Sequence, residues 1–192
     1  MVKVVVHRHI PNLLTALRVA AAFVPLAVLA SAQATAAGVA LLVLAIAAAT
    51  DFLDGKLARA WGVTSRVGQV LDSVADKLIL ASLLVLAIQI GLFGPVGVAI
   101  ALLLLLREIW VGGLREGLGE RSALLSATRA AKWKTTFQFA GLLLVFADAW
   151  AGLRLGWLAE LALAPALLLS LISAWDYSRR GLAALAERDE PR

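Results

Sequence analysis

Six long apolar runs constrain this chain more than any other feature of its sequence. Several of them are long enough to cross about 30 Å of hydrocarbon as a helix. Hydrophobic residues make up 61% of the 192 residues, whereas globular domains in water are only about half apolar. The sequence therefore predicts an integral membrane protein, with spans at about residues 12–30, 36–50, 78–90, 95–111, 136–151 and 157–176.

The runs predict helices, because segments such as "ALLVLAIAAAT" and "IALLLLL" are apolar all round. A membrane β-barrel would instead alternate apolar and polar residues along each strand. The end of the first run, "ASAQA", also resembles a signal-peptide cleavage site, but this run is one of six equivalent segments. We expect an all-α protein with six transmembrane helices in a single domain over residues 1–192.

The distribution of lysine and arginine predicts the orientation in the membrane, because cytoplasmic loops collect these residues. With the N-terminus inside, all but one of the 18 basic residues fall on the cytoplasmic side, and Arg154 is the exception. Both termini are therefore expected in the cytoplasm. Glu160 lies near an outer turn, so its side chain is expected to be solvated. The net charge of +5 suits an anionic lipid surface, and without a soluble basic domain we expect no nucleic-acid partner.

All the acidic residues of the first hundred positions lie in one stretch, residues 51–76. Asp51 and Asp54 are three residues apart, and Asp72 and Asp76 are four apart, so each pair occupies one face of a helix. A short loop through "AWGVTS" joins the two helices, which can therefore turn their carboxylates toward each other. The same two helix faces carry Gly55, Ala58, Arg59 and Gly68.

Four carboxylates at close range repel one another in a partly dry site unless cations neutralise them. The chain has no cysteine, and His7 and His9 lie at the N-terminus, so the ligands are all oxygen, which favours Mg²⁺, Mn²⁺ or Ca²⁺. Two such cations suit displacement at phosphorus. Arg59 would then meet a phosphate, and the small residues would admit a ligand, although small residues in membrane helices also serve helix packing.

The pattern D-x2-D-G-x2-A-R-x8-G-x3-D-x3-D resembles the signature of the CDP-alcohol phosphotransferases, and all eight of its positions are filled. The resemblance implies the CDP-alcohol phosphotransferase fold. Proteins with this fold are homodimeric six-helix enzymes, and this one would lie in the inner membrane with its active site facing the cytoplasm. Such an enzyme uses two divalent cations, Mg²⁺ or Mn²⁺, to join an alcohol to the phosphatidyl group of CDP-diacylglycerol, releasing CMP.

The resemblance also implies roles for individual residues. Asp76 would take the proton from the attacking hydroxyl. The metal ligands would be Asp51, Asp54, Asp72 and Asp76. The CDP group would be bound by Asn12, Gly55, Ala58, Arg59, Ser65 and Gly68.

Three further segments indicate the acceptor alcohol: "IPNLLTALR" at 10–18, "REIWVGGLRE" at 107–116 and "KWKTT" at 132–136. They resemble segments of bacterial phosphatidylglycerophosphate synthases, which use sn-glycerol 3-phosphate. Independently, an acceptor that carries its own phosphate needs cations beyond the metals. The candidates on the cytoplasmic ends of helices are Arg107, Arg115, Lys132 and Lys134.

Two alternatives remain open at this point. The same chemistry could serve another acceptor, such as an inositol phosphate, serine or phosphatidylglycerol. A divalent-cation transporter could also place aspartates in a membrane, although it would leave Gly55 and Arg59 without a role.

Overall fold

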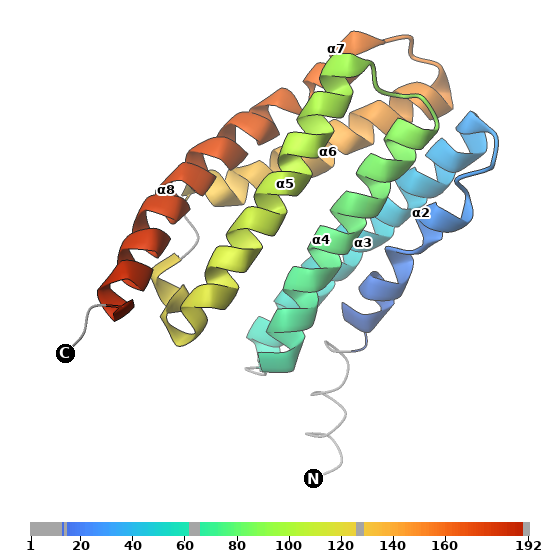
Figure 1. Ribbon diagram of the computed structural model, residues 1–192. Coiled ribbons are helices and arrows are strands. Elements are labelled where there is room, and N and C mark those ends of the chain that lie inside the picture. The colour runs from blue at the N-terminus through green and yellow to red at the C-terminus, as the bar shows by residue number, and fades with distance from the viewer. Residues whose placement is uncertain (1–12, 14, 62–65, 126–128, 190–192) are drawn as a thin grey trace. The chain divides into compact units, whose positions relative to one another are not determined.

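The computed structural model describes residue 13 and residues 15–61, 66–125 and 129–189, and in this part of the chain it contains helices and no strand (Figure 1). The predicted all-α architecture is confirmed, and each apolar run falls on helical segments. Residues 15–21 are helical. The elements that follow are α2 (Val24–Ala27), α3 (Gln33–Trp61), α4 (Arg66–Gln89), α5 (Pro95–Leu118), the 3₁₀ helix η1 (Gly119–Leu125), α6 (Arg129–Ala151), α7 (Trp157–Leu161) and α8 (Ala164–Asp189).

Three segments in the described part of the chain are long and apolar enough to cross a membrane: Gln33–Asp51, Pro95–Leu118 and Trp157–Ala186. A shorter apolar segment covers Thr15–Ala27. The helices α4 and α6 have 24 and 23 residues, but each carries charged residues, most of them in its first half. These features indicate a membrane protein, and the six-span topology with cytoplasmic termini stays a prediction.

The chain forms two compact units. The first consists of Met1–Leu92 and Val145–Arg154, and the second of Phe93–Leu144 and Leu155–Arg192. The helix α6 contributes its first part to the second unit and its last residues to the first. The single domain over residues 1–192 stays a prediction.

In the first unit, α3 packs against α2 and α4. Small side chains are buried along the first half of α3, where Ala36, Ala37 and Ala40 are 0% exposed. A Cβ atom added to Gly38 would lie 3.2 Å from Cδ1 of Trp150. Such small residues let membrane helices approach closely, so the first half of α3 serves helix packing.

The helix α4 ends in a Schellman motif. The N–H of Leu92 donates to the carbonyl of Ala87 at 2.9 Å, and the N–H of Gly91 donates to that of Ile88 at 3.1 Å. Gly91 has φ 72°, a conformation that glycine adopts without strain. The helix therefore stops at a defined point.

In the second unit, α5 packs along α8, and a buried face of α5 repeats every three or four residues (Figure 1). Glu160 of α7 binds the start of α5, where its carboxylate accepts hydrogen bonds from the N–H groups of Gly94 and Gly97, both at 3.0 Å. A carboxylate is favoured there because the first N–H groups of a helix lack partners within the helix. The expectation that Glu160 is solvated is therefore wrong.

Candidate metal centre and basic cluster

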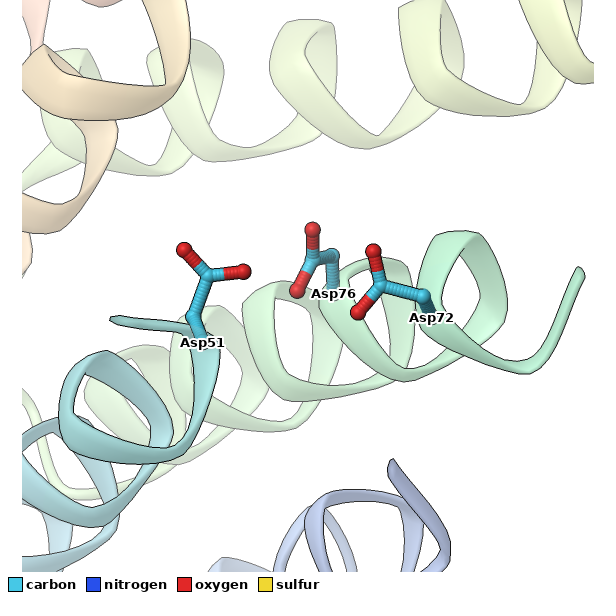
Figure 2. A group of neighbouring side chains, drawn as sticks. All are labelled: Asp51, Asp72 and Asp76. Atoms are coloured by element: carbon cyan, nitrogen blue, oxygen red, sulfur yellow. The ribbon is translucent and has the colours of Figure 1, made fainter. Parts of the chain in front are cut away.

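Three of the four predicted metal ligands converge in the first unit (Figure 2). Asp51 comes from α3, whereas Asp72 and Asp76 lie one turn apart on α4. One carboxylate oxygen from each residue lies within 4.8 Å of the other two. The side chains of Asp72 and Asp76 are 43% and 42% exposed, so the cluster is open to a ligand.

The remaining residues predicted for this site lie partly or wholly outside the described part of the chain. Gly68 lies in the first turn of α4 and is half-buried. For four further residues the structure describes the backbone, which is part of α3, but not the side chains: Asp54, Gly55, Ala58 and Arg59. Asn12 and Ser65 lie outside it altogether, so the roles of all these residues stay predictions.

Arg18 also belongs to this site, in addition to the residues predicted from the sequence. Its side chain is fully buried, and its Nη1 lies 2.5 Å from Oδ1 of Asp72, 3.4 Å from Oδ1 of Asp76 and 3.5 Å from Oδ1 of Asp51. A signal in the sequence could have found it, because an arginine inside an apolar run needs a partner.

Thr50 holds the other side of the Arg18 guanidinium. Its buried Oγ1 accepts a hydrogen bond from Arg18 Nε at 3.3 Å and lies 2.7 Å from the carbonyl oxygen of Ile46, to which it can donate. Arg18 therefore connects the helical residues 15–21 with α3 and, through Asp72 and Asp76, with α4.

The donor set of this cluster suits a hard divalent cation. Its converging oxygens are all carboxylate oxygens, which Mg²⁺, Mn²⁺ and Ca²⁺ prefer. The guanidinium of Arg18 at the same oxygens demonstrates that the cluster attracts positive charge. Asp51, Asp72 and Asp76 could therefore hold a metal ion.

Two of the four predicted acceptor-binding cations meet at one acid in the second unit. Oε1 of Glu108 accepts hydrogen bonds from Nη1 of Arg107, at 2.9 Å, and from Nζ of Lys134. Arg107 lies on the buried face of α5 and donates further bonds to the carbonyl of Ser170 at 3.2 Å and to Oγ of Ser173 at 2.7 Å. Glu108, which is not among the residues predicted for the site, is the centre of this network.

Arg115 has a different environment. Arg115 is exposed, and its Nη2 donates a hydrogen bond to the carbonyl of Leu125 at 3.3 Å. Its guanidinium carbon lies 5.6 Å from the ring centroid of Tyr177. Arg107 and Arg180 lie 6.0 and 5.4 Å from the same ring, distances at which a cation is attracted to the ring face. The backbone of Lys132 is part of α6, and its side chain lies outside the described part.

Comparison with known proteins supports one family. The family model described as CDP-alcohol phosphatidyltransferase matches residues 8–174. A relative from Cereibacter sphaeroides is 33% identical over 93% of this chain and 97% of its own length. A relative from Rickettsia felis is 31% identical over 90% of this chain and 94% of its own, and one from Haemophilus influenzae is 41% identical over 53% and 55%.

All three relatives carry the name CDP-diacylglycerol–glycerol-3-phosphate 3-phosphatidyltransferase. The family match covers most of the chain and includes the whole aspartate stretch, residues 51–76. The three aspartates that converge in the structure, Asp51, Asp72 and Asp76, all belong to the motif recognised in the sequence. The chain belongs to the CDP-alcohol phosphatidyltransferase family.

Proposed function

We propose that this protein transfers the phosphatidyl group of CDP-diacylglycerol to sn-glycerol 3-phosphate, forming phosphatidylglycerophosphate and releasing CMP. The shared name of relatives that align over nearly the whole chain supports this reaction. The observation that carries the proposal is the convergence of three carboxylate oxygens from Asp51, Asp72 and Asp76.

Asp51, Asp54, Asp72 and Asp76 would hold two divalent cations, Mg²⁺ or Mn²⁺. Bound there, the cations would neutralise the phosphate oxygens and the charge that develops on the departing CMP. The acceptor hydroxyl attacks the phosphorus bonded to diacylglycerol, the bond from this phosphorus to the CMP oxygen breaks, and Asp76 takes the hydroxyl proton. The partial exposure of the Asp76 side chain supports its access to the acceptor.

The CDP group would be positioned by Asn12, Gly55, Ala58, Arg59, Ser65 and Gly68. Arg59 would contact a phosphate oxygen, and the small residues would let the nucleotide approach the helix backbone. Holding the donor phosphorus in line with the acceptor hydroxyl supplies much of the rate in such a displacement.

Arg107, Arg115, Lys132 and Lys134 would select an acceptor that carries a phosphate. Their environments suggest a division of roles. Arg107 and Lys134 are already bound by Glu108, with side chains only 5% and 10% exposed. Arg115 is exposed, so we propose that it contacts the acceptor phosphate directly, while Arg107 and Lys134 maintain the positive potential behind it.

We propose that the enzyme is a multi-pass protein of the inner membrane, with both termini and the active site on the cytoplasmic side. The near absence of lysine and arginine from the predicted outer segments supports this orientation. One domain over residues 1–192 and a homodimer follow from the family pattern.

The decisive test is CMP release by the purified protein with CDP-diacylglycerol and Mg²⁺ or Mn²⁺. The acceptors compared are glycerol 3-phosphate, serine, inositol, inositol phosphate and phosphatidylglycerol. We expect strong stimulation by glycerol 3-phosphate and loss of activity with a chelator. Stimulation by another acceptor alone would refute the acceptor assignment while leaving the phosphatidyl transfer in place.

A further inference from the structure

The aspartate cluster contains a positive charge supplied by the chain itself. A single nitrogen of Arg18, Nη1, lies within 3.5 Å of an oxygen from each of Asp51, Asp72 and Asp76. The arginine side chain is 0% exposed, whereas the three carboxylates remain partly open to solvent. The arginine thus approaches the cluster from the protein interior, and a ligand would approach it from the solvent.

We infer that Arg18 is an internal counter-ion of this cluster, a positioning residue that competes with divalent cations for the aspartate oxygens. An oxygen that accepts a charge-assisted hydrogen bond from a guanidinium has less negative charge to offer a metal. A guanidinium a few ångströms from a bound dication also repels it. Arg18 therefore lowers the affinity of the cluster for divalent cations.

The surroundings of Arg18 keep it close to the cluster. Its Nε donates to Oγ1 of Thr50, the residue next to Asp51, and removing a buried guanidinium from its carboxylates would leave its charge without compensation. The benefit is stability, since carboxylates crowded at the membrane edge repel one another when no cation is bound. The inference rests on the divalent cations of the proposed function, but not on the acceptor or on the reaction.

The test compares Mn²⁺ binding by the full-length wild type and the Arg18→Gln variant in detergent. Mn²⁺ alone is titrated and the free ion is measured by electron paramagnetic resonance. The unfolding temperature is measured with EDTA and with saturating Mn²⁺. Arg18→Lys keeps the charge, and Arg179→Gln is the matched control because Arg179 is an exposed arginine of α8.

We expect Arg18→Gln to bind Mn²⁺ about tenfold more tightly or better, because a neutral side chain no longer repels the dication. The same variant should unfold at a lower temperature in EDTA and regain the difference in Mn²⁺. Arg18→Lys and Arg179→Gln should bind Mn²⁺ like the wild type. A structural role for Arg18 alone would lower the unfolding temperature without tightening metal binding.

The failure of this inference and the failure of the proposed metal site give different results. Unchanged or weaker Mn²⁺ binding by folded Arg18→Gln, with normal binding by the wild type, overturns the role of Arg18 and leaves the metal site intact. No Mn²⁺ binding by either protein overturns both.

If Arg18→Gln does not fold, Thr50→Val serves as the second variant, since valine is similar in size and keeps the arginine charge. It removes one hydrogen bond that holds the competing guanidinium, so Mn²⁺ binding should tighten about three- to fivefold. Unchanged or weaker binding by this variant overturns the inference.

Discussion

Glu108 offers the sharpest test of the packing in the second unit, through the substitution Glu108→Gln. Its Oε1 accepts bonds from both Arg107 and Lys134, and its side chain is 14% exposed. Glutamine can still accept a hydrogen bond but cannot neutralise two buried cations. Removing one partner of a buried ion pair costs about 3 kcal/mol or more, so we expect the free energy of unfolding to fall by about 3 kcal/mol.

A second substitution isolates the cause of this loss. Arg107 keeps its bonds to Ser170 and Ser173, so most of the cost should fall on Lys134. Adding Lys134→Met to Glu108→Gln removes the uncompensated ammonium and should restore about 2 kcal/mol.

The assay is reversible unfolding in mixed detergent micelles, followed by tryptophan fluorescence and circular dichroism. Glu116→Gln is the matched control, because Glu116 is an exposed acid of the same helix and its loss should change stability by no more than about 0.5 kcal/mol. The reasoning is refuted if Glu108→Gln loses as little as this control, or if Lys134→Met gives no recovery in the double variant.

Three further predictions concern packing, catalysis and acceptor binding. Gly97→Ala would place a Cβ 2.5 Å from Oε2 of Glu160 and should lower the free energy of unfolding by about 1–3 kcal/mol. Gly113→Ala is the control, because the space around Gly113 is open, and it should be neutral or stabilising. Equal effects of the two substitutions in a thermal unfolding assay would contradict this prediction. Asp76→Asn should retain CDP-diacylglycerol binding but lose at least about 100-fold in kcat for CMP release, and near-normal turnover would remove Asp76 from the mechanism. Arg115→Ala should raise the KM for glycerol 3-phosphate about tenfold or more and change the KM for CDP-diacylglycerol by less than about twofold. Equal changes in the two constants would argue against a direct contact between Arg115 and the acceptor phosphate.

Much of the fold could be predicted because helical features are local. An apolar run in a membrane must satisfy its backbone hydrogen bonds internally, and this alone leads to helices over the six predicted runs. Likewise, a spacing of four residues places Asp72 and Asp76 on one face of α4 whatever surrounds it. The four-residue connection from Trp61 to Arg66 then brings α3, with Asp51, back beside α4.

The partners of single charges could not be predicted in the same way. Arg18 meets Asp72 from 54 positions away, and Glu160 reaches the N–H of Gly94 across 66 positions. No periodicity in the sequence relates such residues. Their pairing depends on how far one helix is shifted and rotated against another, so the sequence predicts only a cytoplasmic side for Arg18 and, wrongly, a solvated position for Glu160.

The helical membrane architecture, the family and the two aspartate pairs can all be predicted from the sequence, because each depends on residue type and on spacing within one helix. Which cation of the chain lies against Asp51, Asp72 and Asp76 follows instead from the packing between helices. The same kind of packing brings Arg107 and Lys134 to Glu108 and leaves Arg115 exposed. The physical reason is that a charge in a packed helical protein must find its partner where the interhelical packing brings one within hydrogen-bonding distance, and that packing is a property of the whole fold.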